Sequence, residues 1–103
     1  MPSNQYKLLI RETNEHTIYF IFKLKSQTNN SLSIEDKHYF IIPNNKTLKS
    51  YHYSDNYETF KLDDNDTMYD ISYERWQELL RFFIKNDGTY VHIIDLNILQ
   101  KRE

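Results

Sequence analysis

The sequence predicts an α+β protein, in which a mostly antiparallel sheet of about six strands packs on one amphipathic helix to form two layers. The elements are expected in the order βββββαβ. Short segments of alternating apolar and polar residues are separated by turn-forming residues, which is typical of antiparallel strands. One segment, residues 72–86, instead repeats its large apolar residues every three or four positions, which is typical of a helix with one buried face. With 103 residues in all, residues 1–103 are expected to form a single compact domain.

The first two strands are expected at residues 6–12 and 17–25, because apolar and polar side chains alternate in both segments. A loop with an odd number of residues would bring Leu8 beside Phe22. A three-residue loop over residues 14–16 meets this condition, and Asn tolerates the left-handed conformation that such loops use. These two strands are therefore predicted to form a hairpin.

The middle of the chain is expected to continue the sheet. Residues 26–33 are almost all polar and are predicted to form a loop. A third strand is expected at residues 38–42, and it ends at Pro43, which has no backbone N–H to donate. Residues 47–53 and 57–62 are predicted to be the fourth and fifth strands, with a turn between them.

The helix over residues 72–86 has clear signals at both ends. Asp70 or Ser72 is expected to cap its start, where unpaired backbone N–H groups need an acceptor. Gly88 follows its end, where a positive φ is often required. A last strand is expected at residues 90–99. The predicted buried face of the helix is formed by Tyr73, Trp76, Leu80 and Phe83.

The composition excludes several kinds of chemistry. There is no Cys, so disulfides, Cys-ligated zinc and thiol catalysis are absent. Gly88 is the one glycine, whereas phosphate-binding loops and nucleophile elbows need several. The N-terminal residues are polar, and the longest apolar run is far shorter than the roughly 20 residues that a membrane span needs. A cytoplasmic location with no membrane partner is therefore expected.

No catalytic or metal site is predicted, and no cofactor is expected. Asp63, Asn65 and Glu74 fall on the liganding positions of a calcium loop, but Met68 stands where that loop needs Gly. No arrangement of nucleophile, base and orienting group is visible, so the protein is predicted not to be an enzyme. The histidines are isolated in the sequence and none has a partner at metal-ligand spacing: His16, His38, His52 and His92.

Acidic residues are concentrated in one part of the chain. The formal net charge is −2, yet residues 55–78 alone contribute eight acidic and two basic side chains. Asp70 and Glu74 fit the start of a helix, where negative charge is favourable. The Tyr-rich residues just upstream have the composition of binding loops. The candidate partner-binding residues are Tyr51, Tyr53, Asp55, Tyr57, Glu58, Asp63, Asp64, Asp66 and Tyr69.

These observations favour a small non-enzymatic protein-binding module. Its acidic Tyr-rich surface would occlude a basic site on a nucleic-acid-processing protein, such as a nuclease, by steric and electrostatic means. Phage counter-defence proteins and immunity proteins act in this way, and the residue usage is typical of AT-rich genomes, including those of phages and mobile elements. A solvated turn followed by a helix start would also explain the acidic residues.

An alternative function is binding of single-stranded nucleic acid. The second face of the predicted first hairpin combines basic side chains with an aromatic one, as sheets that bind single strands often do. The residues of this alternative nucleic-acid face are Lys7, Arg11, Tyr19, Lys23 and Lys25.

Overall fold

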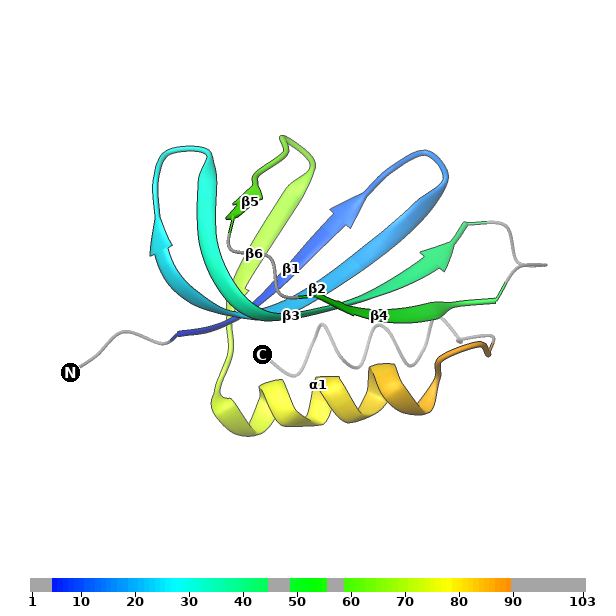
Figure 1. Cartoon of the computed structure of the whole chain (residues 1–103). Coiled ribbons are helices and arrows are strands. Elements are labelled where there is room, and N and C mark those ends of the chain that lie inside the picture. Colours follow the sequence, from blue (N-terminus) through cyan, green and yellow to red (C-terminus); the bar gives the residue numbers. More distant parts are fainter. Residues whose placement is uncertain (1–4, 45–48, 56–58, 90–103) are drawn as a thin grey trace.

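The computed structural model describes residues 5–44, 49–55 and 59–89, which form an α+β fold, as the sequence predicts (Figure 1). Within these residues a six-stranded antiparallel sheet packs on one helix. The last predicted strand, residues 90–99, lies outside the described residues. The elements follow one another as β1 (Tyr6–Glu12), β2 (His16–Gln27), β3 (Ser31–Pro43), β4 (Tyr51–Asp55), β5 (Thr59–Lys61), β6 (Asp66–Asp70) and α1 (Tyr73–Lys85).

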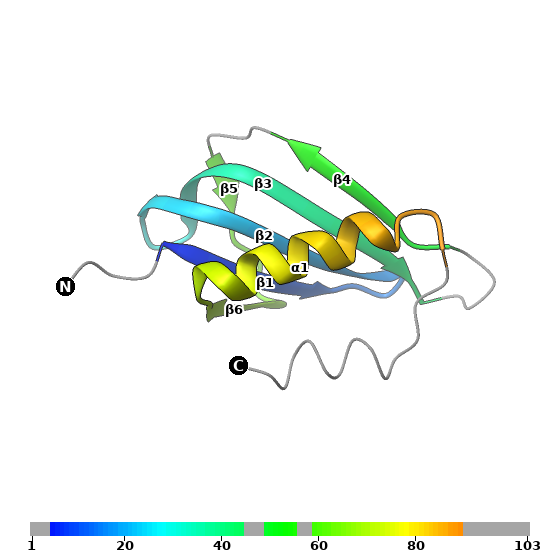
Figure 2. The same ribbon diagram turned by 90° about the horizontal axis from the view of Figure 1, so that it is seen from below.

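The sheet curls away from the helix. Its strand order is β4-β3-β2-β1-β6, and β5 pairs with one end of β3. The helix lies beneath the sheet in Figure 1 and crosses the strands in Figure 2, while the strand ends bend upward on the opposite side. We call the side covered by α1 the helix-side face and the other side the concave face.

Each face of the sheet carries a buried core. This explains why Leu8, Leu9 and Ile10, three consecutive residues, are each at most 5% exposed. On the helix-side face the strands contribute Leu8, Ile10, Tyr19, Ile21 and Phe40, which pack against Ile71 and, on α1, Trp76, Leu79 and Phe83. The core of the concave face consists of Leu9, Phe20, Phe22, Leu32, Ile34 and Phe60.

The register of the first hairpin differs from the prediction. Leu8 pairs with Ile21 and does not lie beside Phe22. The loop between the paired residues contains an even number of residues, 13–16, instead of the predicted odd number. The prediction assumed that one face of the hairpin is buried. Because both faces are buried, the apolar pattern alone does not select between the two possible registers.

The second and third strands are longer than predicted. The polar loop expected over residues 26–33 is restricted to residues 28–30, and both Leu32 and Ile34 belong to the core of the concave face. Two irregularities in the β2–β3 register and a φ of 54° at Asp36 interrupt the regular ladder. Such irregularities bend paired strands, which is how this hairpin curls over its own core.

The fourth and fifth strands do not form the predicted hairpin with each other. β4 extends to Asp55 and pairs with residues 37–41 of β3, whereas β5 pairs with residues 31–33 of the same strand. Since β3 is 13 residues long, it offers room for both partners along one edge. β4 and β5 therefore follow one another beside β3.

The sequence analysis predicted no strand at β6, which pairs with β1 at the opposite edge of the sheet. Asp residues at both ends made this segment resemble a polar turn, because Asp is uncommon in strands. Two cross-strand ion pairs, Lys7 with Asp70 and Arg11 with Asp66, offset that preference.

The helix begins and ends as predicted. Ser72 Oγ accepts a hydrogen bond from the Arg75 N–H at 3.0 Å, and Gly88 has a φ of 76° just beyond the helix end. Tyr73, however, is 50% exposed and does not belong to the buried face. No helix among the described residues is long and apolar enough to cross a membrane. The buried residues of α1 are Arg75, Trp76, Leu79 and Phe83.

Candidate functional site

Two exposed tyrosines mark the edge of the sheet at β4. Tyr51 and Tyr53 are 47% and 45% exposed, although both are large rings on a regular strand. They alternate with His52 and therefore point to the same side of the sheet. Their β3 neighbours in the register are Ile41 and Tyr39, and Tyr39 packs against the core of the concave face. We call Tyr51 and Tyr53 the tyrosine pair.

One ring of the tyrosine pair is supported from below by other aromatic rings. Tyr53 stacks on Tyr39 with ring centroids 5.2 Å apart and an angle of 22° between the planes. Tyr39 in turn lies 5.5 Å from Phe20, which lies 4.8 Å from Phe60. Tyr53 is therefore the exposed end of a row of packed rings, and this support restricts its side-chain motion before any partner binds.

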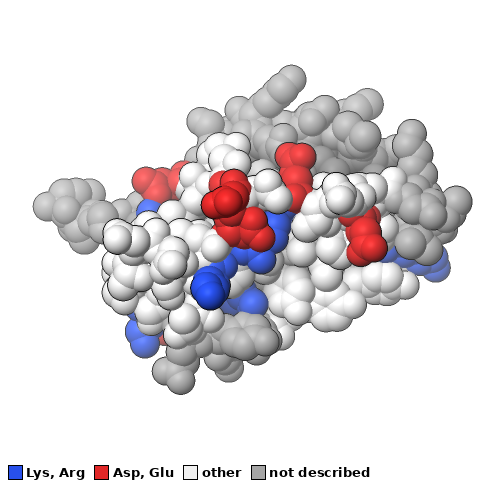
Figure 3. Space-filling view, turned by 90° about the horizontal axis from the view of Figure 1, so that it is seen from above, with Lys and Arg blue, Asp and Glu red and all other residues white. Residues whose placement is uncertain are grey.

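Two basic side chains lie on the same row of rings. The Lys37 ammonium is 4.9 Å from the Tyr39 ring centroid and 5.3 Å from that of Phe60. The Arg11 guanidinium is 5.1 Å from the Phe60 centroid. Such cation–π contacts stabilise positive charge on an aromatic surface. Seen from above the concave face, basic side chains lie in the middle, acidic groups lie mainly along one side of them, and further basic groups lie nearer the margin (Figure 3).

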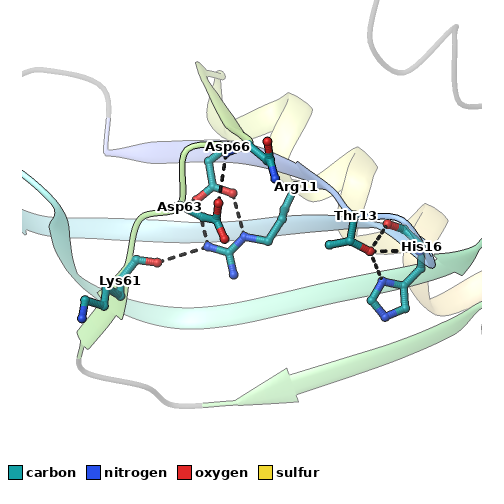
Figure 4. A network of polar contacts seen from close by, with 7 residues as sticks. Arg11, Thr13, His16, Lys61, Asp63 and Asp66 are labelled. Atoms are coloured by element: carbon teal, nitrogen blue, oxygen red, sulfur yellow. Dashed lines mark hydrogen bonds and ion pairs between the residues drawn. The ribbon is translucent and has the colours of Figure 1, made fainter.

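The Arg11 guanidinium is held by a carboxylate from β6 (Figure 4). Arg11 Nε donates to Asp66 Oδ1 at 2.7 Å, and Arg11 Nη2 donates to Asp66 Oδ2 at 2.8 Å and to the Lys61 carbonyl at 3.1 Å. The hydrogen bond with Asp66 raises the pKa of Arg11 against the opposing effect of burial. The Asp63 N–H also donates to Asp66 Oδ2, at 2.7 Å. Asp66 thus joins β1, β6 and the turn before β6.

The predicted partner-binding residues do not gather into one surface. The tyrosine pair is on β4, whereas Tyr69 is on the opposite edge strand and faces the helix side beside Leu8. Asp63 and Asp64 are exposed in the turn before β6, and Asp66 is engaged with Arg11. The backbone of Asp55 ends β4. Tyr57 and Glu58 lie outside the described residues.

The residues of the alternative nucleic-acid face are also distributed over both faces. Lys7 pairs with Asp70 and Arg11 pairs with Asp66 on the concave face. Tyr19 is 3% exposed and packs against Phe83 under the sheet. Lys23 lies over the Tyr6 ring, 5.8 Å from its centroid, and Lys25 is exposed near the end of β2. This distribution follows from the hairpin register, which differs by one residue from the predicted one.

The structure also brings together two histidines that the sequence analysis regarded as isolated. His38 Nδ1 and His52 Nε2 are 3.4 Å apart, on the helix-side face of β3 and β4. Their strands are neighbours, and the residues are separated by 14 positions in the chain. The sequence could have indicated this contact only if the pairing of β3 with β4 had been predicted. His92 lies outside the described residues.

The described residues contain no group of three or more His, Asp or Glu side chains that could hold a metal ion. Comparison of the chain with protein-family models, with curated proteins and with solved structures gives no significant match. Among the described residues, the tyrosine pair combines two exposed rings on one strand with a stacked ring beneath Tyr53.

Proposed function

We propose that the protein is a small non-enzymatic protein-binding module that docks on a basic site of another protein and blocks it. The partner would be a nuclease or another nucleic-acid-binding effector, and the protein would act as an inhibitor of the phage counter-defence or immunity-protein type. The observation that carries the proposal is the tyrosine pair, two adjacent rings that are nearly half exposed on an edge strand.

The tyrosine pair has the properties of an interface anchor. Tyrosine is enriched among the residues that dominate binding free energy, because a rigid ring buries much area at a small cost in conformational entropy. The stack of Tyr53 on Tyr39 reduces that cost further, since the ring is already oriented in the free protein. A monomer gains nothing from leaving two such rings side by side in water, so their exposure favours a contact with a partner.

The negative charge of residues 55–78, which follow the tyrosine pair in the sequence, supports a basic partner. Residues 55–78 carry a formal charge of −6, and Asp63 and Asp64 in this segment are exposed. Exposed carboxylates attract a basic partner over distances up to about 10 Å, the screening length at 0.1 M salt. Asp66 contributes less, because Arg11 neutralises it. The acidic groups are therefore assigned to steering, and the tyrosine pair to the contact itself.

The single-stranded nucleic-acid alternative has weaker support. The two basic side chains it places on β1 are neutralised by Asp70 and Asp66, and its one aromatic residue, Tyr19, is buried. Binding of single strands depends on free positive charge along a groove and on exposed rings. Fluorescence anisotropy with labelled single-stranded DNA and RNA at low salt tests it directly, and saturable micromolar binding would favour it over the protein-binding module.

The test of the proposal is a comparison of two tyrosine variants as capture baits. Tyr51→Ser/Tyr53→Ser removes the tyrosine pair, and Tyr69→Ser removes a 40% exposed tyrosine from the opposite edge. Nuclease-treated lysate of the natural host is passed over each bait, and retained proteins are quantified by mass spectrometry. We expect a basic protein that wild type and Tyr69→Ser retain in stoichiometric amount and that the double variant loses. Equal retention by all three baits would refute the role of the tyrosine pair.

A further inference from the structure

The histidine pair, His38 and His52, is arranged as a hydrogen-bonded couple. The two facing nitrogens are 3.4 Å apart and the ring planes are nearly parallel, at 9°. The ring centroids, however, are 5.6 Å apart, much further than the nitrogens. The rings therefore lie edge to edge along the line that joins the nitrogens. In this arrangement one ring donates an N–H to the lone pair of the other.

The histidine pair joins β4 to β3 near the start of β4. His38 is on β3 and His52 on β4, two positions off from direct cross-strand neighbours, so this diagonal contact adds to the backbone ladder between the strands. Beneath it lies the indole of Trp76, with its ring centroid 6.3 Å from that of His38. The His52 backbone N–H donates to Asp87 Oδ1 at 2.9 Å. Through these contacts, β4 is held against β3 and against the turn that follows α1.

Protons control the contact within the histidine pair. When both rings are neutral, or when one is protonated, a single proton lies between the facing nitrogens and the hydrogen bond is kept. When both rings are protonated, both facing nitrogens carry a proton, so the hydrogen bond is lost and two cations lie side by side. The two sites therefore titrate as a coupled system.

The surroundings of the histidine pair favour the neutral state at neutral pH. Burial lowers the pKa of His38, and the charge of His52 lowers it further, against the opposing effect of Asp36. Burial also lowers the pKa of His52, and Asp87 opposes this. On the side of α1 the pair faces an uncharged indole. The Asp36 and Asp87 carboxylates are thus the described charges that favour protonation of the histidine pair. The pair binds a first proton more readily than a second, because the second places two cations side by side.

We propose that the histidine pair is a proton-sensitive contact that holds β4 in place at neutral pH and releases it in mildly acidic solution. The tyrosine pair alternates with His52 on the same strand, so release of β4 also disturbs the ring stack of Tyr53 on Tyr39. Acidification would then switch off docking. This last step rests on the proposed function, whereas the release of β4 does not.

The release of β4 can be measured without a partner, by amide hydrogen exchange at pH 7.5 and pH 5.5 after correction for intrinsic rates. We expect β4 to be less protected than β1 at both pH values and its protection to fall about tenfold at pH 5.5, because protonation of the histidines favours the released strand. β1 serves as the internal reference for global unfolding. Equal protection of β4 and β1 at both pH values would mean that β4 is released only when the whole fold unfolds, and unchanged protection of β4 would mean that protons do not release it; either result would overturn the proposal.

Three variants assign the effect to the histidine pair. His38→Gln and His52→Gln each keep a polar side chain but remove one titrating ring, and each should abolish the acid-induced loss of protection in β4. His16→Gln is the matched control, since His16 lies at the start of β2 and contacts Thr13. It should behave as wild type. If both pair variants keep the wild-type pH dependence, or if His16→Gln removes it, the histidine pair is not the sensor.

The outcome for docking is separate. If Tyr51→Ser/Tyr53→Ser retains the captured protein as wild type does, the proposed function fails, yet the exchange result still decides whether the histidine pair holds β4. If docking depends on the tyrosine pair but β4 protection does not respond to pH, the regulation fails and the proposed function stands.

Discussion

Asp66→Ala is expected to destabilise the protein far more than substitutions of its acidic neighbours. The carboxylate accepts two hydrogen bonds from Arg11 and one from the Asp63 N–H. The Asp66 side chain is 4% exposed and that of Arg11 is 20% exposed. Loss of one partner costs about 3–5 kcal/mol for a fully buried pair, against about 0.2–1 kcal/mol for an exposed pair. Because this pair is closer to the buried case, we expect the free energy of unfolding to fall by about 2–4 kcal/mol.

Urea denaturation followed by the fluorescence of Trp76, the one tryptophan of the chain, measures this change. The midpoint of thermal unfolding should fall by roughly 10–20 °C for a protein of this size. Asp64→Ala is the matched control, since Asp64 is exposed in the same turn and should change stability by at most about 0.5 kcal/mol. If the free energies of unfolding of the two variants differ by less than about 0.5 kcal/mol, Asp66 does not join β1 to β6 in the way described.

Two further predictions concern the helix-side face. Trp76→Ala removes a 6% exposed side chain that packs on Tyr6, so the free energy of unfolding should fall by about 3–5 kcal/mol. Urea denaturation followed by circular dichroism measures this change, and a fall of less than about 1 kcal/mol would contradict the core position of Trp76. Stability should also depend on pH. The pKa values of His38 and His52 are lowered from 6.5, so the unfolded chain binds more protons than the folded protein in acid. The free energy of unfolding should therefore be highest above about pH 6.5 and should fall as the pH drops below this value. Urea series between pH 7.5 and 5.5 test this, and a flat profile would exclude it.

The helix could be predicted because its signals are local. Ser72 is three residues from the N–H that it caps, and the apolar residues repeat within a few turns. Tyr73 was assigned wrongly to the buried face because it continues the same periodicity. In the structure Tyr73 packs instead on Tyr6, at the margin of the helix-side core, with ring centroids 5.2 Å apart. The apolar periodicity indicates which side of the helix is buried, but the sheet that packs against the helix determines how many residues of that side are covered.

The sheet could be predicted as a class but not in its pairing. Alternation indicates a strand, yet it selects a register only when one face is polar, and here both faces are buried. The strand β6 was missed because Asp66 and Asp70 disfavour a strand locally. Their spacing of four matches that of Arg11 and Lys7 on β1, and this complementary charge pattern was the available signal.

The candidate site was predicted in part. Composition identified Tyr51 and Tyr53, which are exposed, but it could not separate Asp66 from Asp63 and Asp64. That distinction depends on Arg11, 55 positions away in the chain. The histidine pair was missed for the same reason. In both cases the role of a side chain is set by a neighbour that only the strand pairing provides.

The structure also divides the acidic residues into those that are occupied and those that remain available to a partner. Asp66 and Asp70 neutralise basic side chains of β1, and Glu78 pairs with Arg75 at 2.6 Å. Asp63 and Asp64 remain exposed. The acidic surface is therefore smaller than the charge of −6 over residues 55–78 suggests. Its contribution to docking should be mainly kinetic.

This division predicts different kinetic effects for two double variants against the captured partner. Asp63→Asn/Asp64→Asn should lower the association rate constant severalfold at low salt and leave the dissociation rate constant nearly unchanged, because exposed charges steer the encounter. Tyr51→Ser/Tyr53→Ser should raise the dissociation rate constant by about tenfold or more, because anchoring side chains contribute more than 1 kcal/mol each. Biolayer interferometry at 50 and 300 mM salt separates the two constants. An effect of the Asn substitutions that persists at high salt would show that these carboxylates contact the partner directly.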